Sequence, residues 1–181
     1  MRRICVYSGS SLGGNPAYSQ AAKELAAVLV GHDIELVYGG ASVGIMGVLA
    51  DEVLDVGGKV HGVIPKMLEQ KEIAHKGLTE LHVVGSMHAR KSMMAALSDG
   101  FIAMPGGFGT LEEIIEIVTW GQLQFHDKPC GLLNTNGYFD QLVGYFRHAN
   151  AEGFLRDENR TNDWGNVFYD LWAGNGKSAP V

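Results

Sequence analysis

The segment Pro105-Gly-Gly-Phe-Gly-Thr-Leu-Glu-Glu113 lies between an apolar run at residues 101–104 and an amphipathic run that begins at Leu111. This order predicts a strand, a tight turn and a helix. The three glycines of the turn leave backbone N–H groups uncovered by side chains. A helix that begins near Thr110 directs its unpaired N–H groups and its positive dipole end into the same space. The segment therefore predicts a phosphate-binding loop.

The same residues also fit a turn that binds no ligand, with Thr110 as the N-cap of the helix and Glu113 as its capping-box partner. The segment lacks the Lys-Ser or Lys-Thr pair of a Walker loop and the six-residue glycine spacing of a dinucleotide fingerprint. A carboxylate one turn inside a phosphate loop repels an anion unless a cation compensates it. Glu113 therefore calls for a positively charged partner.

Arg90 and Lys91 form an adjacent basic pair shortly after an apolar run at residues 79–84. They follow the end of this run, and parallel sheets bind their ligands in a crevice beyond the ends of their strands. Arg90 and Lys91 are therefore the expected partners of Glu113 and of a phosphate. The alternative is that both side chains lie on a solvated helix face, where most lysines and arginines are found.

Composition favours one cytoplasmic domain. The chain has 181 residues, 46% of them hydrophobic, and we expect one domain over residues 1–173 with a flexible tail at 174–181. A net charge of −6 with 14 Lys and Arg argues against binding to nucleic acid. No apolar stretch approaches membrane-spanning length or resembles a signal peptide, so we expect no membrane contact. Cys5 and Cys130 lie in separate apolar runs, as buried thiols do in a reducing compartment.

Strands and helices alternate along the chain, which predicts a single-domain α/β fold: a Rossmann-like, doubly wound parallel sheet flanked by helices. We expect strands at 3–8, 34–38, 59–64, 79–84, 101–104 and 131–134. We expect helices at 17–30, from the glycine loop at 39–47 to residue 55, where two glycines end it, and at 87–97, 111–124, 138–152 and 164–172, with an irregular connection at 65–77.

Ligands of such sheets bind beyond the carboxyl ends of the strands, so four segments are expected to converge on one crevice: residues 8–11, 39–47, 86–91 and 106–113. The glycines at 39–47 fit close strand–helix packing as well as ligand contact. No set of His, Cys, Asp and Glu residues has the spacing of a metal site, and no acyl-transfer motif is present. We expect no metal and no cofactor.

Two of these motifs resemble those of the LONELY GUY (LOG) family. Residues 105–113 fit its Pro-Gly-Gly-x-Gly-Thr-x-x-Glu signature, and Met87-His-Ala-Arg-Lys91 fits its second motif. The resemblance extends over residues 3–155. It implies a cytokinin riboside 5'-monophosphate phosphoribohydrolase, which hydrolyses the N-glycosidic bond of N6-substituted adenosine monophosphates or of AMP. It also implies a homodimer.

By this resemblance, Arg90 and Glu113 are the catalytic pair. The residues implied to bind the 5'-phosphate are Gly106, Gly107, Phe108, Gly109 and Thr110. The residues implied to contact the rest of the substrate are Ser10, Gly39, Gly40, Glu72, Met87, Lys91, Leu111, Glu112 and Thr119.

Two other functions fit the fold. One is a nucleotide-binding or molybdenum-cofactor carrier that holds a phosphorylated ligand without hydrolysing it. A carrier has no need of a carboxylate inside its phosphate loop, so Glu113 favours the enzyme. The other is the lysine decarboxylase label sometimes given to this family. That chemistry needs a lysine that forms a Schiff base with pyridoxal phosphate, and Lys91 is better explained as a substrate contact.

Overall fold

A single parallel sheet organises the described part of the chain, residues 1–69 and 74–155 of a computed structural model. Its six strands lie in the order β4-β3-β2-β1-β5-β6, and every pairing is parallel. The strands are β1 (Arg3–Tyr7), β2 (Glu35–Tyr38), β3 (Val60–Pro65), β4 (Glu80–Val84), β5 (Gly100–Ala103) and β6 (Cys130–Leu132). The predicted α/β, doubly wound parallel sheet is confirmed.

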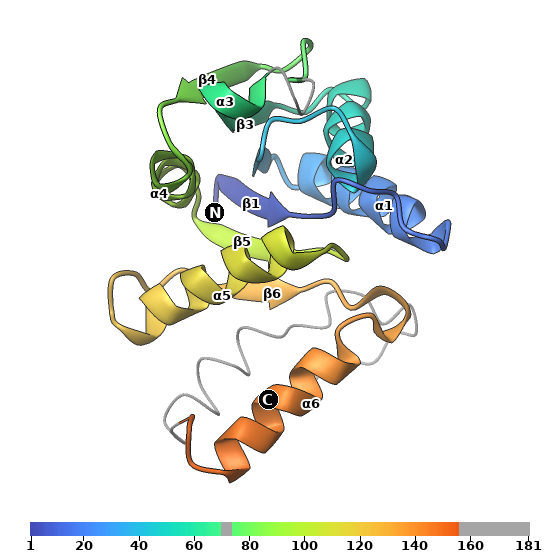
Figure 1. Ribbon diagram of the computed structural model, residues 1–181. Helices are drawn as coiled ribbons and strands as arrows, with labels where there is room; N and C mark the ends of the chain where they lie inside the picture. The colour runs from blue at the N-terminus through green and yellow to red at the C-terminus, as the bar shows by residue number, and fades with distance from the viewer. Residues whose placement is uncertain (70–73, 156–181) are drawn as a thin grey trace.

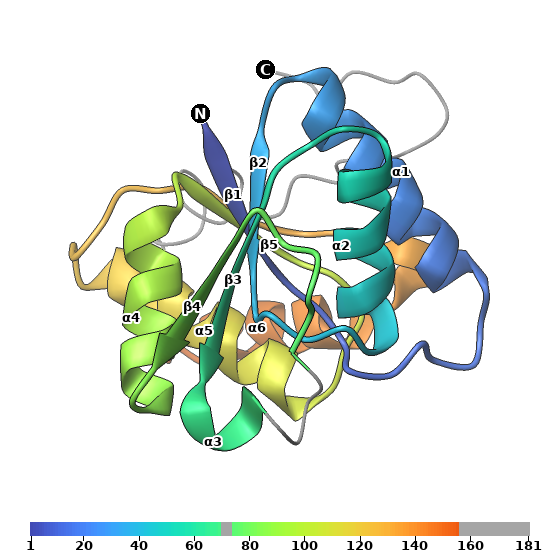
Figure 2. The same cartoon turned by 90° about the horizontal axis from the view of Figure 1, so that it is seen from above.

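Helices cover both faces of this sheet (Figures 1 and 2). They are α1 (Ala17–Gly31), α2 (Gly44–Asp55), the short α3 (Lys66–Glu69), α4 (Met87–Leu97), α5 (Phe108–Gln122), the 3-10 turn η1 (Thr135–Gly137) and α6 (Asp140–Ala151). One apolar core lies between the sheet and α1 and α2, and a second lies between the sheet and α4 and α5. Among the described residues, no helix combines the length and the apolar character needed to cross a membrane.

The order of the strands reverses at β1. From β1 the chain adds β2, β3 and β4 on one side, then crosses back so that β5 pairs with the other side of β1. The connections that leave β1 and β5 consequently run to opposite faces of the sheet. This divergence opens a crevice beyond the carboxyl ends of the two strands, where open α/β sheets bind their ligands.

The start of α5 differs from the prediction. The helix begins at Phe108 with Gly107 as its N-cap, and no side chain caps it. The backbone N–H of Leu111 donates to the carbonyl of Gly107 at 3.2 Å, which forms the first helical turn. Thr110 therefore lies inside this turn and not at the N-cap position. The alternative of a capping box formed by Thr110 and Glu113 is therefore wrong. Thr110 is instead buried, with its hydroxyl packed against Gly106.

Two connections also differ. Helix α2 begins at Gly44, inside the predicted glycine loop, because the N–H of Gly47 donates to the carbonyl of Val43 and closes a helical turn there. The connection expected to be irregular at 65–77 contains α3. The predicted end of α2 is confirmed, since Gly57 follows the helix with a φ of 86°. The expected helix at 164–172, the domain end at 173 and the tail at 174–181 lie outside the described residues.

The two cysteines lie in the second core, on β1 and β6. Cys5 is 0% exposed and Cys130 4% exposed. Burial raises the pKa of both thiols, that of Cys130 to about 12.

We expect both thiols to be unreactive toward a water-soluble disulfide reagent in the folded protein, because the reactive thiolate is unfavourable in an apolar core. Both should react fully once guanidinium chloride unfolds the chain, and the released chromophore measures this. Stoichiometric labelling of the folded protein at the rate of a free thiol would contradict the burial of these strands.

Candidate active site

The loops after β1 and β5 are in direct backbone contact. The N–H of Gly9 donates to the carbonyl of Pro105 at 3.1 Å, and the N–H of Met46 donates to the carbonyl of Gly9 at 3.4 Å. A Cβ at Gly106 would overlap the hydroxyl of Thr110 and lie 2.8 Å from the backbone nitrogen of Gly9. Only glycine fits this approach. The predicted convergence of these loops is present, and it arises from the β1–β5 pairing.

The N-terminus of α5 opens into this crevice. Gly107, Phe108 and Gly109 are exposed, Phe108 to 93%, while Thr110 anchors the turn from below. A fifteen-residue helix whose first turn has no side-chain cap presents N–H groups and the positive end of its dipole to the solvent. This is the geometry of an anion site, and it coincides with the predicted phosphate loop.

Arg90 connects the first turn of α4 to the neighbouring strands. Its side chain is buried, with Nε donating to the carbonyl of Val63 at 3.1 Å and Nη2 donating to the carbonyl of Gly39 at 3.1 Å. The guanidinium is thus held at the carboxyl ends of β2 and β3. A planar group with several donors suits this task better than an ammonium. The alternative of a solvated Arg90 is wrong.

Glu113 lies in the second turn of α5, on the sheet face that also receives Arg90. Burial is the main cause that raises the pKa of Cys5 on β1, and the two charges act on that pKa in opposite directions, Glu113 raising it and Arg90 lowering it. The pKa of Tyr7 is raised mainly by burial, and also by Glu113. Both charged groups therefore lie within electrostatic reach of β1, near the end where the crevice opens.

Lys91 joins α4 to α5. Its Nζ lies 2.6 Å from a carboxylate oxygen of Glu112 and 3.0 Å from one of Glu116. Burial alone would lower the pKa of Lys91, but these two carboxylates outweigh burial and raise it. The ammonium expected to face Glu113 and a phosphate thus has two carboxylate partners, of which Glu112 was itself a predicted substrate contact.

The other predicted substrate contacts are spread more widely. Ser10 and Met87 are exposed beside the crevice, Gly39 and Gly40 are buried at the end of β2, and Leu111 is half-buried on α5. Thr119 lies six residues beyond Glu113, roughly 9 Å along the helix axis. Its hydroxyl donates to the carbonyl of Ile115 at 2.7 Å, so the described chain does not bring Thr119 to the loops. Glu72 lies outside the described residues.

A substitution at Gly39 tests the buried position of Arg90. A Cβ there would overlap Nη2 of Arg90 and lie 3.4 Å from the sulfur of Met46. We expect Gly39→Ala to lower the free energy of unfolding by about 1–3 kcal/mol, the usual cost of overpacking, in urea denaturation. Gly14→Ala is the matched control, since a Cβ at Gly14 meets no atom within 4 Å, and its effect should stay within about 0.5 kcal/mol. Equal stabilities of the two variants would contradict the observed packing.

Two residues of the crevice were not predicted as contacts. The hydroxyl of Tyr138 donates to the carbonyl of Gly106 at 2.6 Å, and its ring packs edge-on against Tyr18 at 5.7 Å. Nothing in the local sequence distinguishes Tyr138 from a surface tyrosine. Ser8 is buried at the end of β1, and its Oγ makes no hydrogen bond within the described residues. Residues 8–11 were predicted to lie at the crevice, but Ser8 itself was not predicted as a contact.

The crevice is distinct from a cavity of about 540 Å³ beside α1. Apolar side chains of α1 and of the strand ends line that cavity, including Leu25, Ile34 and Leu133. It lies on the α1 face of the sheet, opposite Glu113, and contains none of the predicted site residues. We therefore place the candidate site at the loops after β1 and β5, on the basis of their backbone N–H groups and charged side chains, and not at this cavity.

The fold defines a Rossmann-like protein with a crevice beyond the ends of β1 and β5, and solved structures share this fold. The molybdenum cofactor carrier protein of Chlamydomonas reinhardtii superposes with a TM-score of 0.64 at 22% identity, over 81% of this chain and 85% of that one. The molybdenum cofactor binding protein of Rippkaea orientalis gives a TM-score of 0.62 at 24% identity, over 84% and 85%. At these identities the likeness establishes the fold alone.

The amino-acid sequence is much more similar to a second group of proteins than to these carrier proteins. Residues 46–164 match the family described as "Possible lysine decarboxylase". The chain is 51% identical to the probable cytokinin riboside 5'-monophosphate phosphoribohydrolase LOGL1 of Oryza sativa subsp. japonica, over 87% of this chain and 71% of that protein. It is 50% identical to the cytokinin riboside 5'-monophosphate phosphoribohydrolase LOG1 of Arabidopsis thaliana, over 85% and 72%. The chain belongs to this family, the LOG proteins.

Proposed function

We propose that the chain hydrolyses the N-glycosidic bond of cytokinin riboside 5'-monophosphates, releasing the free base and ribose 5-phosphate. The activity named for relatives that are half identical to it supports this reaction. The observation that carries the proposal is on α5. One helix presents an uncapped N-terminus to the crevice and, within two turns, the carboxylate of Glu113.

The phosphate is proposed to bind at Gly107, Phe108, Gly109 and Thr110, with Gly106 allowing the close approach of the loop after β1. The buried Oγ of Ser8 is available as a further donor. Held there, the phosphate fixes the ribose over the second turn of α5. Binding energy from this remote group orients C1' for reaction, which is a large part of the rate enhancement in such enzymes.

Glu113 is proposed to act at C1'. As the bond from C1' to the base nitrogen breaks, positive charge develops on the ribose, and a carboxylate at this position stabilises it. The attacking water forms the new C1'–O bond as the bond from C1' to the base nitrogen breaks, and one proton of this water passes to Glu113. The departing base takes up a proton from solvent, and Glu113 then returns its proton to solvent, so that the net reaction consumes one water. Arg90, fixed by the carbonyls of Gly39 and Val63, supports the leaving base or orients Glu113.

Lysine decarboxylation, the activity in the family description, does not suit Lys91. A Schiff-base lysine must present a neutral amine to pyridoxal phosphate. Although burial opposes it, the hydrogen bonds to Glu112 and Glu116 raise the pKa of Lys91 and keep the ammonium charged. Its place between α4 and α5 fits a role in positioning the two helices beside the substrate.

The test is to incubate the purified protein with isopentenyladenosine 5'-monophosphate, AMP and isopentenyladenosine, and to follow the free base by chromatography. We expect base from the first substrate and at least about a hundredfold lower kcat/KM for the nucleoside, because the phosphate site is then empty. A nucleoside cleaved as fast as its monophosphate would contradict the assignment of the loop. Nucleotide that binds without any release of base would favour a carrier.

Three narrower statements belong to the same proposal. AMP is a second substrate, and its rate relative to the isopentenyl compound measures the preference for an N6 group. The protein acts in the cytoplasm, without nucleic acid or membrane. It acts as a homodimer, which the exposed apolar side chains of Phe108, Leu123 and Phe125 on and after α5 support. Sedimentation of the purified protein tests the assembly.

A further inference from the structure

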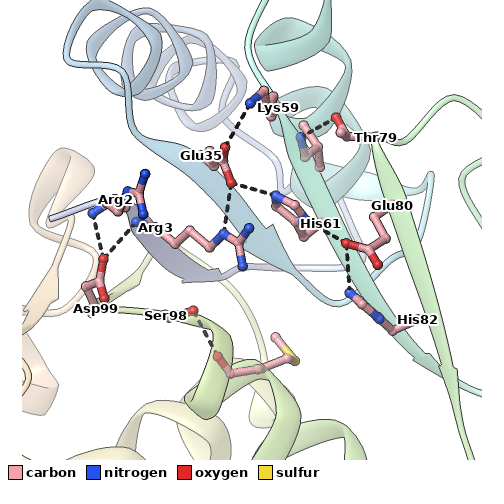
Figure 3. A network of polar contacts seen from close by, with 12 residues as sticks. Arg2, Arg3, Glu35, Lys59, His61, Thr79, Glu80, His82, Ser98 and Asp99 are labelled. Atoms are coloured by element: carbon pink, nitrogen blue, oxygen red, sulfur yellow. Dashed lines mark hydrogen bonds and ion pairs between the residues drawn. The ribbon is translucent and has the colours of Figure 1, made fainter.

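A cluster of titratable side chains lies at the opposite end of the sheet from the crevice. It consists of His61 at the start of β3 with Glu80 and His82 on β4, the edge strand (Figure 3). His61 is directly paired with Glu80, and Val63 with His82. Paired residues of parallel strands point to the same face, and alternate residues of one strand share that face. The register therefore brings all three side chains together on the α4 face.

The three ligating atoms converge. Nδ1 of His61 lies 3.3 Å from Oε2 of Glu80, and Nε2 of His82 lies 3.4 Å from the same oxygen. All three atoms lie within 4.8 Å of one another. Zinc bound tetrahedrally at 2.0–2.1 Å from nitrogen or oxygen separates its ligand atoms by about 3.3–3.4 Å. Two of the three separations already match a coordinated ion.

Glu35 fixes the tautomer of His61. The Glu35 carboxylate is held in place by Nε of Arg3 at 2.8 Å and by Nζ of Lys59 at 3.2 Å. The Glu35 carboxylate accepts a hydrogen bond from Nε2 of His61 at 2.8 Å. The proton of a neutral His61 is thus on Nε2, and the lone pair of Nδ1 faces the Glu80 carboxylate. A carboxylate behind a ligating histidine is the usual outer shell of a metal site.

His82 supplies the observation that protonation of His61 does not explain. If His61 carried protons on both ring nitrogens, Nδ1 could donate a hydrogen bond to Glu80, and the short distance between these two groups would need no metal ion. Nε2 of His82 is nevertheless buried and makes no hydrogen bond within the described residues, although it lies at ion-pair distance from Glu80. A cation between the three groups would satisfy both nitrogens and the carboxylate at once.

We propose that His61, Glu80 and His82 bind a divalent transition-metal ion of the zinc class. Imidazole nitrogen with one carboxylate is a donor set suited to such ions rather than to calcium or magnesium. The side chain of His61 is 5% exposed and that of Glu80 56%, so the site has a buried side and a side open to solvent for a further ligand. The ion joins the edge strand β4 to β3. It takes no part in the proposed hydrolysis, whose residues lie beyond the other end of the strands.

The spacing along the sequence did not indicate this site, because the ligands come from two strands and meet only through the register of β3 and β4. The expectation of no metal rested on spacing alone.

The experiment uses the full chain, stripped of metal by a chelator and dialysed. Zn(II) binding is measured by calorimetry, and Co(II) binding by its visible absorption. We expect one equivalent per chain, and about 5 °C or more of thermal stabilisation at a hundredfold excess of Zn(II) over Kd. His61→Gln and His82→Gln should each weaken binding at least tenfold. His82→Gln is the safer variant, because His82 is less buried than His61.

His75→Gln is the matched control. His75 also faces a carboxylate, Asp51 at 2.8 Å, but belongs to no three-residue cluster among the described residues. Its removal should leave affinity within about twofold. The proposal is overturned by a chain that binds neither ion, by affinity that both cluster variants retain, or by an equal loss in His75→Gln. Release of base by the metal-free protein tests the proposed function separately.

Discussion

Glu113→Gln is expected to slow the release of base by about 10²–10⁴-fold, the range that a positioned acid–base group contributes. Glutamine keeps the size of the side chain but removes the negative charge proposed to stabilise the ribose and the carboxylate oxygen proposed to accept a proton from water. The phosphate loop is unchanged by the substitution. The nucleotide should therefore still bind, with a Kd within about threefold of that of the parent protein. Calorimetry measures this Kd, under conditions in which less than one nucleotide per chain is hydrolysed during the titration.

Glu116→Gln is the matched comparison, since Glu116 lies one turn further along α5 and its carboxylate is engaged by Lys91. We expect its rate to fall by less than about tenfold. If Glu116→Gln and Glu113→Gln lose activity equally, the effect belongs to the negative charge of the helix as a whole, and the specific role of Glu113 is wrong.

Arg90→Ala is expected to lose both stability and activity. The substitution removes the two hydrogen bonds that Arg90 donates to the carbonyls of Gly39 and Val63, and it removes a cation held at the crevice. The free energy of unfolding in urea should fall by about 3 kcal/mol, since charge-assisted hydrogen bonds to buried groups are lost. The rate of base release, measured where the variant remains folded, should fall at least about a hundredfold.

Arg90→Lys separates the two effects. It restores a charge but not a planar group that reaches two carbonyls, so it should recover part of the stability and little of the activity. Arg147→Ala, at an exposed arginine on α6, should change neither quantity by more than about 0.5 kcal/mol or twofold. Full activity in Arg90→Lys would show that charge alone is required.

The sheet and the place of the crevice could be predicted because alternating strands and helices, with glycines after the strands, allow few arrangements. The start of α5 could not, because Thr110 carries the usual signal of an N-cap while its hydroxyl is used in packing against Gly106. Local sequence cannot reveal that a side chain is needed elsewhere.

Contacts between distant segments were predicted only where topology forced them. The approach of Arg90 and Glu113 to β1 followed from strand order. The carboxylate partners of Lys91, the hydrogen bond of Tyr138 and the cluster at His61 depend on helix rotation and strand register, which no short motif encodes.

The pairing of β1 with β5 also has a consequence for how the protein acquires activity as it folds. Strands β1, β2 and β3 each pair with the next strand along the chain, whereas Ile4 on β1 must meet Gly100 on β5, with β2, β3 and β4 between them in the sequence. Contacts of such long separation carry the largest loop-closure entropy. Release of base during refolding therefore reports the closure of this one pairing, and native-like helical signal can precede the first turnover.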